Sequence, residues 1–293
     1  MLKLNGIYPP LPASFNKRGE LDGGKITENI EALCRHDLAG ILVLGSNGEL
    51  VMLDDDEKKK VYNLARKTIP GDKLMLAGTG AQSTRQTIKL SVMASEAGAD
   101  AVLVLSPSYY KGQMNRKALV QFYHEVADSS PVPVIIYNMP ANSGLDMDAD
   151  TILESAAHDN IIGIKDSGGN LVKMASLIKN AKEGFQVLAG SAGFLLPALS
   201  IGAVGGILAL ANIAPELCLD IYNSFLNGDA VKAKKYQLKA VDINTAVTRK
   251  GGVPALKAAM DHLGMYGGPV RRPLLPLDDE SRKQLIALIE KTL

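Results

Sequence analysis

The sequence predicts an α/β fold in which eight parallel strands close into a (β/α)8 TIM barrel with a C-terminal helical appendage. Three observations predict this fold. Short apolar runs recur along the chain, segments with helical periodicity lie between them, and only helical patterns follow Leu210. Alternation of strand and helix is typical of a parallel sheet covered by helices, and eight such units suit a closed barrel.

The predicted strands are short runs rich in Val, Ile and Leu, each ended by small or polar residues. Apolar residues at consecutive positions indicate strands that are buried on both faces, as in a parallel sheet. In chain order the predicted strands are Leu4–Ile7, Gly40–Leu44, Leu74–Ala77, Ala101–Leu105, Val132–Tyr137, Ile161–Lys165, Phe185–Ala189 and Val204–Leu208.

The predicted helices follow from capping signals and from the spacing of apolar residues. Ser83 and Gln86 form a capping-box pattern at the start of one helix, and Gly98 is placed to end it. Residues 54–68 and 117–129 predict two further helices. In the first of these, acidic residues come before basic residues, as the helix dipole favours.

The order of the elements also divides the chain. An open sheet that binds dinucleotides needs the pattern GxGxxG after its first strand. Here that strand is followed by Tyr8-Pro9-Pro10, so we favour the barrel. We expect residues 1–226 to form the barrel with the active site, and residues 227–293 to form helices packed on it. The helical patterns of this second part cover Ala230–Thr245, Pro254–Leu263 and Asp279–Leu293.

Composition excludes several classes of function. The 293 residues carry a formal net charge of +1 and contain no basic run of the kind that binds nucleic acid or anionic membranes. The longest apolar stretch, Ile201–Ile213, contains three glycines and is too short to span a bilayer. The first residues also lack the pattern of a signal peptide.

Cysteine and histidine usage narrows the expectation further. Cys34 and Cys218 lie far apart in the sequence, so we expect no disulfide framework and a cytoplasmic protein. The four histidines show no metal-ligand spacing, so we expect no metal.

Lys165 is the residue that carries most information about chemistry. Active sites of (β/α)8 barrels lie at the carboxyl ends of the strands, and Lys165 ends the apolar run Ile161–Ile164. Lysine rarely enters a core, and desolvation there favours the neutral amine, which is the nucleophile for a carbonyl carbon. The alternative is an ion pair between Lys165 and Asp166 at the barrel rim, and the pattern alone leaves it open.

Polar residues at other predicted strand ends complete a candidate site. Tyr137 ends the neighbouring strand, where its phenol could shuttle protons or simply lie at the rim. Ser46 and Asn47 occupy a glycine-flanked turn that could hold a carboxylate, or could be only a tight turn. Ser167 and the loop 190–193 could equally hold a phosphate, although no cluster of arginines accompanies them.

At these residues the sequence resembles the dihydrodipicolinate synthase / N-acetylneuraminate lyase superfamily of class I pyruvate-dependent aldolases. The motifs GSNGE, YNMP, GIKDS and GSAG begin at Gly45, Tyr137, Gly163 and Gly190, in order at the ends of the second, fifth, sixth and seventh predicted strands. Within the superfamily the chain is most similar to the aldolases that cleave 4-hydroxy-2-oxoglutarate.

The resemblance implies roles for the strand-end residues. Lys165 would form a Schiff base with a 2-oxo acid, and Tyr137 would shuttle protons. Ser46 and Asn47 would bind the carboxylate of the pyruvate half of the substrate. The chemistry implied is that of a carbon–carbon lyase which needs neither a metal nor an organic cofactor.

The resemblance also implies further contacts and an assembly. Ser167 and Gly190 would line the same pocket. Tyr110 would reach into the site of a neighbouring subunit, within a homotetramer built as a dimer of dimers.

One position separates the possible substrates. Dihydrodipicolinate synthases usually carry an arginine where this chain has Asn142, and an amide cannot replace a bidentate guanidinium as a carboxylate clamp. We therefore expect Asn142 to contact a different substrate, 4-hydroxy-2-oxoglutarate, which would be cleaved to pyruvate and glyoxylate. The sequence assigns no residue to its distal carboxylate.

Four alternatives stay open at this point. Three are enzymes that use the same imine chemistry: 4-hydroxy-tetrahydrodipicolinate synthase, a 2-keto-3-deoxy sugar acid aldolase or dehydratase, and N-acetylneuraminate lyase. The fourth is a non-catalytic sensor of 2-oxo acids, which would need neither Lys165 nor Tyr137.

Overall fold

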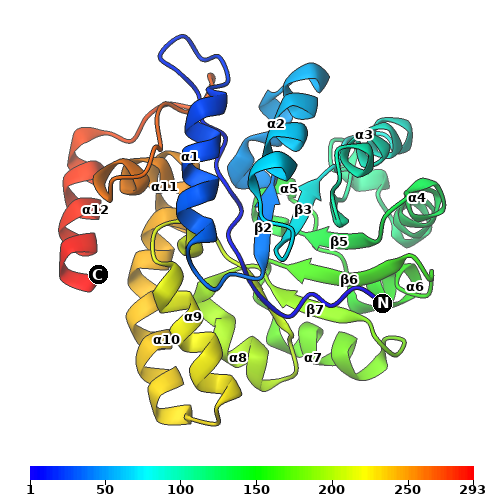
Figure 1. Ribbon diagram of the computed structural model, residues 1–293. Coiled ribbons are helices and arrows are strands. Elements are labelled where there is room, and N and C mark those ends of the chain that lie inside the picture. The colour runs from blue at the N-terminus through cyan, green and yellow to red at the C-terminus, as the bar shows by residue number, and fades with distance from the viewer.

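The computed structural model describes all residues, 1–293, and confirms the predicted (β/α)8 barrel (Figure 1). Eight parallel strands are ordered β1-β8-β7-β6-β5-β4-β3-β2 in one sheet. Each predicted strand overlaps an observed one, with ends that differ by no more than a few residues. The strands are β1 Gly6–Tyr8, β2 Gly40–Val43, β3 Leu74–Gly78, β4 Ala101–Leu105, β5 Val134–Asn138, β6 Ile161–Asp166, β7 Gln186–Ala189 and β8 Gly205–Ile207.

The seam between β1 and β2 closes the barrel without a regular ladder. Pro9 and Pro10 follow β1 and have no N–H group to donate. The hydrogen bonds across the seam therefore come mostly from the β2 side, where Leu42 N donates to Pro9 O at 3.0 Å and Ala39 N donates to Ile7 O at 3.1 Å. The short β1 thus reflects the prolines, which prevent its extension as a paired strand.

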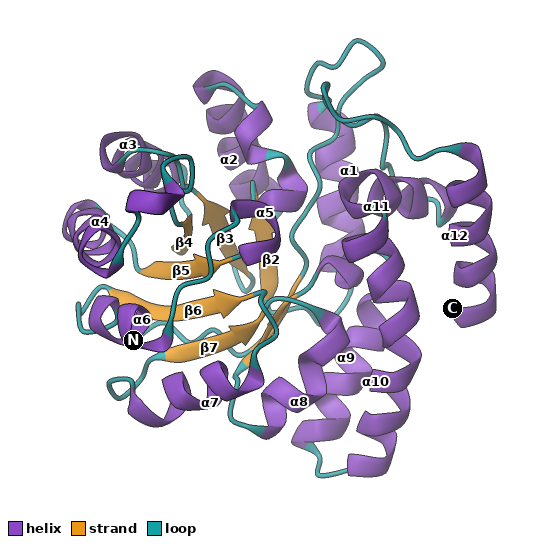
Figure 2. Cartoon of the chain, turned by 180° about the vertical axis from the view of Figure 1, so that it is seen from behind, coloured by secondary structure: helices purple, strands orange, loops and turns teal.

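Helices surround the sheet, and the capping signals explain where several begin (Figure 2). The first barrel helices are α1 Gly23–Cys34, α2 Asp55–Thr68, α3 Thr84–Glu96, α4 Arg116–Ser129, α5 Pro140–Ser143, α6 Ala149–Ser155, α7 Leu171–Asn180 and α8 Leu195–Ser200.

The capping box predicted at α3 is only half right. Ser83 Oγ accepts a hydrogen bond from Gln86 N at 3.3 Å, as predicted. The side chain of Gln86 does not turn back to the helix start. It donates to both carboxylate oxygens of Asp55, at 2.9 and 3.0 Å, and so joins α3 to α2.

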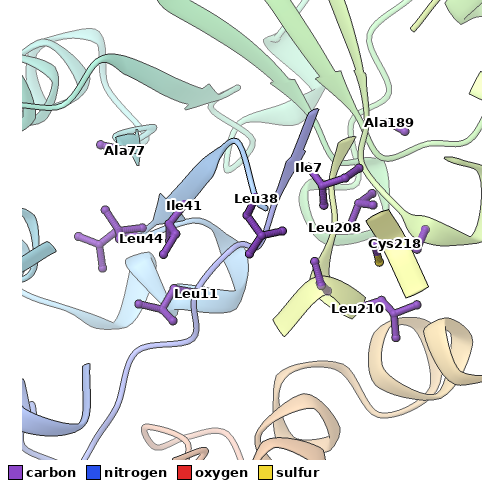
Figure 3. Close-up of a cluster of buried hydrophobic side chains, with 14 of the residues drawn as sticks. Ile7, Leu11, Leu38, Ile41, Leu44, Ala77, Ala189, Leu208, Leu210 and Cys218 are labelled. Carbon is purple, nitrogen blue, oxygen red and sulfur yellow. The ribbon is translucent and has the colours of Figure 1, made fainter. Parts of the chain in front are cut away.

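Two hydrophobic clusters form the core. Eleven buried residues fill the inside of the barrel, among them Leu42, Leu103 and Tyr137. A second cluster of 63 buried residues lies between the strands and the helices, and Figure 3 shows the part of it around Ile7 and Leu208. The filled interior leaves the carboxyl-end rim as the place for a cavity.

The last helices lie together at one side of the barrel (Figure 2). They are α9 Pro215–Leu226, α10 Ala230–Thr245, α11 Gly252–His262 and α12 Asp279–Thr292, with a π-helical segment, Ala246–Lys250, between α10 and α11. Their buried residues belong to the same large cluster as the barrel helices. None of the helices combines the length and the hydropathy that crossing a membrane requires.

Candidate active site

Lys165 and Tyr137 lie side by side at the carboxyl ends of β6 and β5. The two residues are register partners in the parallel pair, so their side chains share one face of the sheet. Lys165 Nζ lies 4.3 Å from the centre of the Tyr137 ring. A register shift near Val134 and Ile135 sets this alignment. The placement predicted by counting along the two apolar runs is confirmed.

The Lys165 amine is buried and has no carboxylate partner. Both Lys165 and Tyr137 are 4% exposed. Asp166, which follows Lys165 in the sequence, forms its ion pair with Lys173 at 3.2 Å, so the alternative of a Lys165–Asp166 rim pair is wrong. The amine therefore makes no ion pair within the chain and lines the cavity as an unpaired nitrogen.

Ser46 and Asn47 lie in the short 3₁₀ turn Ser46–Gly48, and a residue of unusual backbone conformation lies close to each end of it. Leu44 and Glu49 have φ angles of 54° and 52°, a region that non-glycine residues rarely adopt. The turn brings Ser46 Oγ to 3.3 Å from the hydroxyl of Tyr137. Ser46 thus contacts the phenol beside Lys165.

Glu49 holds this turn through buried charge. Its carboxylate pairs with Lys257 Nζ of α11 at 2.6 Å and accepts a hydrogen bond from Arg271 N at 2.8 Å. Burial lowers the pKa of Lys257, although the Glu49 carboxylate opposes the effect. The C-terminal helices therefore fix the turn that carries Ser46 and Asn47.

Ser167 and Gly190 lie where the loops after β6 and β7 pass closest to each other. Gly190 N donates to Asp166 O at 2.8 Å, and Ser167 N donates to Asn138 O at 2.9 Å. A Cβ atom at position 190 would collide with Ser167 Oγ and with the Asp166 carbonyl oxygen. Glycine is therefore required here by close backbone approach.

One cavity of about 470 Å³ collects nearly all of the predicted site residues. This volume lies within the usual range of small-molecule sites. Of the eight predicted residues, seven line it: Ser46, Asn47, Tyr137, Asn142, Lys165, Ser167 and Gly190.

A second, adjoining cavity of about 530 Å³ shares Ser46, Tyr137 and Asn142 with the first but does not contain Lys165. Tyr110 lines neither cavity. Its side chain is 69% exposed and contacts the ring of Tyr109, edge to face, at 5.0 Å between ring centres. Within one chain, Tyr110 is thus the predicted residue that lies outside the site.

The C-terminal part of the chain contributes cavity residues that sequence reasoning missed. Val247, Thr248 and Arg249 of the π-helical segment line the cavity, as do Gly252 and Val253 at the start of α11. They follow no strand, so a search of strand ends does not find them. The sequence does resemble the same aldolases over Ala246–Lys250, but that resemblance assigns no role to these residues.

The buried Lys165 and Tyr137 lie at the carboxyl-end rim, which is where (β/α)8 enzymes have their active sites. The dihydrodipicolinate synthetase family model matches residues 3–292. The chain belongs to this family, and with it to the lyases.

Relatives of known sequence and structure agree with this placement. A probable mitochondrial 4-hydroxy-2-oxoglutarate aldolase from Emericella nidulans is 37% identical over 96% of this chain and 92% of its own. A 4-hydroxy-tetrahydrodipicolinate synthase from Methanothrix thermoacetophila is 31% identical over 98% of this chain and 96% of its own. The prophage protein YagE from E. coli K12, solved in complex with pyruvate, has a TM-score of 0.93 and 31% identity, and the match covers 99% of each chain.

Proposed function

We propose that the chain is a class I aldolase that forms a Schiff base between Lys165 and a 2-oxo acid. The observation that carries the proposal is the buried amine of Lys165, which lies 4.3 Å from the Tyr137 ring centre and faces the 470 Å³ cavity. A neutral amine in that position attacks a ketone carbon, and a phenol beside it transfers protons.

The reaction then follows in three steps. The Lys165 nitrogen attacks C2 of the 2-oxo acid, and loss of water gives a protonated imine. The imine accepts the electron pair of the C3–C4 bond when Tyr137, through a water or the substrate's own carboxylate, removes the C4 hydroxyl proton. An aldehyde leaves, and the enamine is protonated at C3 and hydrolysed to pyruvate and free Lys165.

Other cavity residues orient the substrate in this scheme. Ser46 and Asn47 bind the C1 carboxylate and so fix the ketone against the amine. The Ser46 hydroxyl, 3.3 Å from the Tyr137 hydroxyl, also orients the phenol. Ser167 and Gly190 line the same pocket.

We propose 4-hydroxy-2-oxoglutarate as the substrate, with pyruvate and glyoxylate as products. Asn142 supports this choice. It lines the cavity but is uncharged, so it cannot hold the carboxylate of the synthase's aldehyde substrate as a guanidinium would. The 37% identity to the Emericella nidulans relative supports it as well. The alternative is 4-hydroxy-tetrahydrodipicolinate synthase, which is the name of several relatives at 31–33% identity.

Two assays separate these reactions. Purified protein with 4-hydroxy-2-oxoglutarate is expected to release pyruvate and glyoxylate in equal amounts. With pyruvate and aspartate semialdehyde it is expected to condense the two far more slowly. Fast condensation without any release of glyoxylate would assign the protein to the synthase reaction instead.

We further propose a cytoplasmic homotetramer, arranged as a dimer of dimers, in which Tyr110 reaches the site of a neighbouring subunit. The support is the 69% exposure of an aromatic ring that lines neither of the two cavities in its own chain. Sedimentation is expected to give about four times the 31.1 kDa of one chain. A Tyr110→Ala variant that keeps full activity would contradict the role of Tyr110.

A further inference from the structure

The cavity that contains Lys165 has few charged lining residues. Among its 21 lining residues, only Lys165 and Arg249 have basic side chains, and no aspartate or glutamate is present. Under the proposed function, Lys165 reacts as the neutral amine with C2 of the substrate. Arg249 is then the one permanent charge of the site, because a guanidinium stays protonated at all relevant pH values.

The Arg249 guanidinium has no partner within the chain. Of the nine arginines, four are paired with a carboxylate, whereas Arg249 and four others make no ion pair and no side-chain hydrogen bond. Of these five unpaired arginines, only Arg249 lines the cavity that contains Lys165. Its planar set of donors, which matches a carboxylate in geometry, is therefore available to a ligand.

Arg249 lines the cavity from an irregular segment of the backbone. Arg249 belongs to the π-helical segment Ala246–Lys250, and such segments are frequent at functional sites. Asn244, just before the segment, donates from Nδ2 to Ser191 Oγ at 2.9 Å, which joins it to the loop after β7. Thr248 Oγ1 donates to Asn244 O at 2.6 Å, so this hydroxyl proton is already used.

The two ends of the cavity thus differ in chemistry. Lys165 is 4% exposed and lies at the inner end, and Arg249 is exposed at the mouth. Asn142, the other polar residue expected at the aldehyde half of the substrate, is uncharged. A substrate that places its ketone at Lys165 and a second anion near the mouth would meet a charge-assisted partner only at Arg249.

We propose that Arg249 binds the distal carboxylate of a dicarboxylic 2-oxo acid and thereby determines the specificity of this site. The inference rests on the proposed imine chemistry and deepens it by naming the group that selects a diacid over a monoacid. Bidentate pairing of guanidinium with carboxylate provides both the affinity and the orientation.

The test compares two substrates that differ only at C5. In Arg249→Gln, kcat/KM is expected to fall roughly 10- to 100-fold for 4-hydroxy-2-oxoglutarate, the usual loss for a charged hydrogen-bonding partner. For 4-hydroxy-2-oxopentanoate, which has a methyl group in place of the distal carboxylate, kcat/KM is expected to change less than about 3-fold. Lys250→Gln is the matched control, because it removes an exposed charge from the same segment but does not line the cavity.

A second measurement does not depend on turnover. Borohydride trapping is followed with 2-oxoglutarate and with 2-oxopentanoate, two ketoacids that cannot be cleaved. The half-saturating concentration of 2-oxoglutarate is expected to rise about 10-fold or more in Arg249→Gln, and that of 2-oxopentanoate is expected to stay unchanged.

The outcomes separate this inference from the proposed function. Equal changes for diacid and monoacid in Arg249→Gln, or no change for the diacid, overturn the role of Arg249 while imine formation stands. If the wild-type protein traps 2-oxoglutarate with an Arg249-dependent affinity but cleaves no 4-hydroxy-2-oxoglutarate, the role of Arg249 holds and the proposed cleavage fails. Absence of any trapped adduct in the wild type overturns both.

Discussion

Asp166 follows Lys165 in the sequence, yet its carboxylate is bound by other groups. It accepts hydrogen bonds from Asn138 Nδ2 at 3.0 Å and Gly168 N at 2.8 Å, and it pairs with Lys173 at 3.2 Å. These contacts satisfy a carboxylate that is completely buried. The carboxylate nearest to Lys165 in the sequence is thus bound by other groups and makes no ion pair with the Lys165 amine.

At the same scale, the hydroxyl of Tyr137 can be tested separately from its ring. Tyr137→Phe keeps the ring that packs inside the barrel and removes the hydroxyl that contacts Ser46. We expect kcat to fall about 10²- to 10⁴-fold, the usual contribution of a positioned proton-transfer group, while some imine with pyruvate still forms. The measurements are steady-state kinetics and borohydride trapping, and an unchanged kcat would remove Tyr137 from the mechanism.

Single residues differ in how far the sequence reveals them. Lys165 and Tyr137 are predictable because each ends an apolar run, and parallel strands bring their carboxyl ends to one rim. Arg249 is not predictable in this way, since it lies in an exposed position of a helical pattern. Arg249 lines the cavity from a π-helical segment, and the spacing of apolar residues does not predict a π-helix.

At the scale of elements, the turn after β2 depends on α11. The left-handed conformation of Glu49 is stabilised by the buried ion pair with Lys257, a residue more than 200 positions away in the chain. Local propensity disfavours this conformation for a glutamate, so a sequence pattern predicts a turn but not its geometry. The strands were predictable, because continuous apolar runs report burial directly.

The ion pair between Glu49 and Lys257 leads to a prediction about the free energy of unfolding. Glu49→Gln leaves a buried ammonium without its anion, and we expect the free energy of unfolding to fall by about 3 kcal/mol. Lys257→Met alone should cost a similar amount. The double variant should recover part of the loss, because no uncompensated charge remains. Urea unfolding measures all three variants, and single variants as stable as the wild type would show that the pair does not hold the turn.

At the scale of the whole molecule, the barrel and the C-terminal helices share one core. The large hydrophobic cluster includes nine residues beyond position 226: Ala240, Ile243, Val247, Ala255, Leu256, Ala259, Met260, Leu285 and Ile289. We therefore propose that the division between residues 226 and 227 separates two parts of the structure that depend on each other for stability.

A truncated chain tests this dependence. Residues 1–226 alone would expose the apolar surface that α10, α11 and α12 cover, and would lose the Lys257 contact to Glu49. We expect this fragment to lack a cooperative thermal transition and to form no imine with pyruvate, whereas the full chain unfolds in one transition. A fragment that unfolds cooperatively and is still trapped by borohydride would show that the barrel is independent.

The claim on which the whole account depends is that the ε-amino group of Lys165 forms a covalent bond to the substrate. The most direct measurement is incubation of the protein with pyruvate and borohydride, followed by mass spectrometry of the peptides. The account predicts one reduced pyruvyl adduct, located on Lys165, and no adduct in Lys165→Ala. An adduct on a different lysine, or activity that persists in Lys165→Ala, would contradict it.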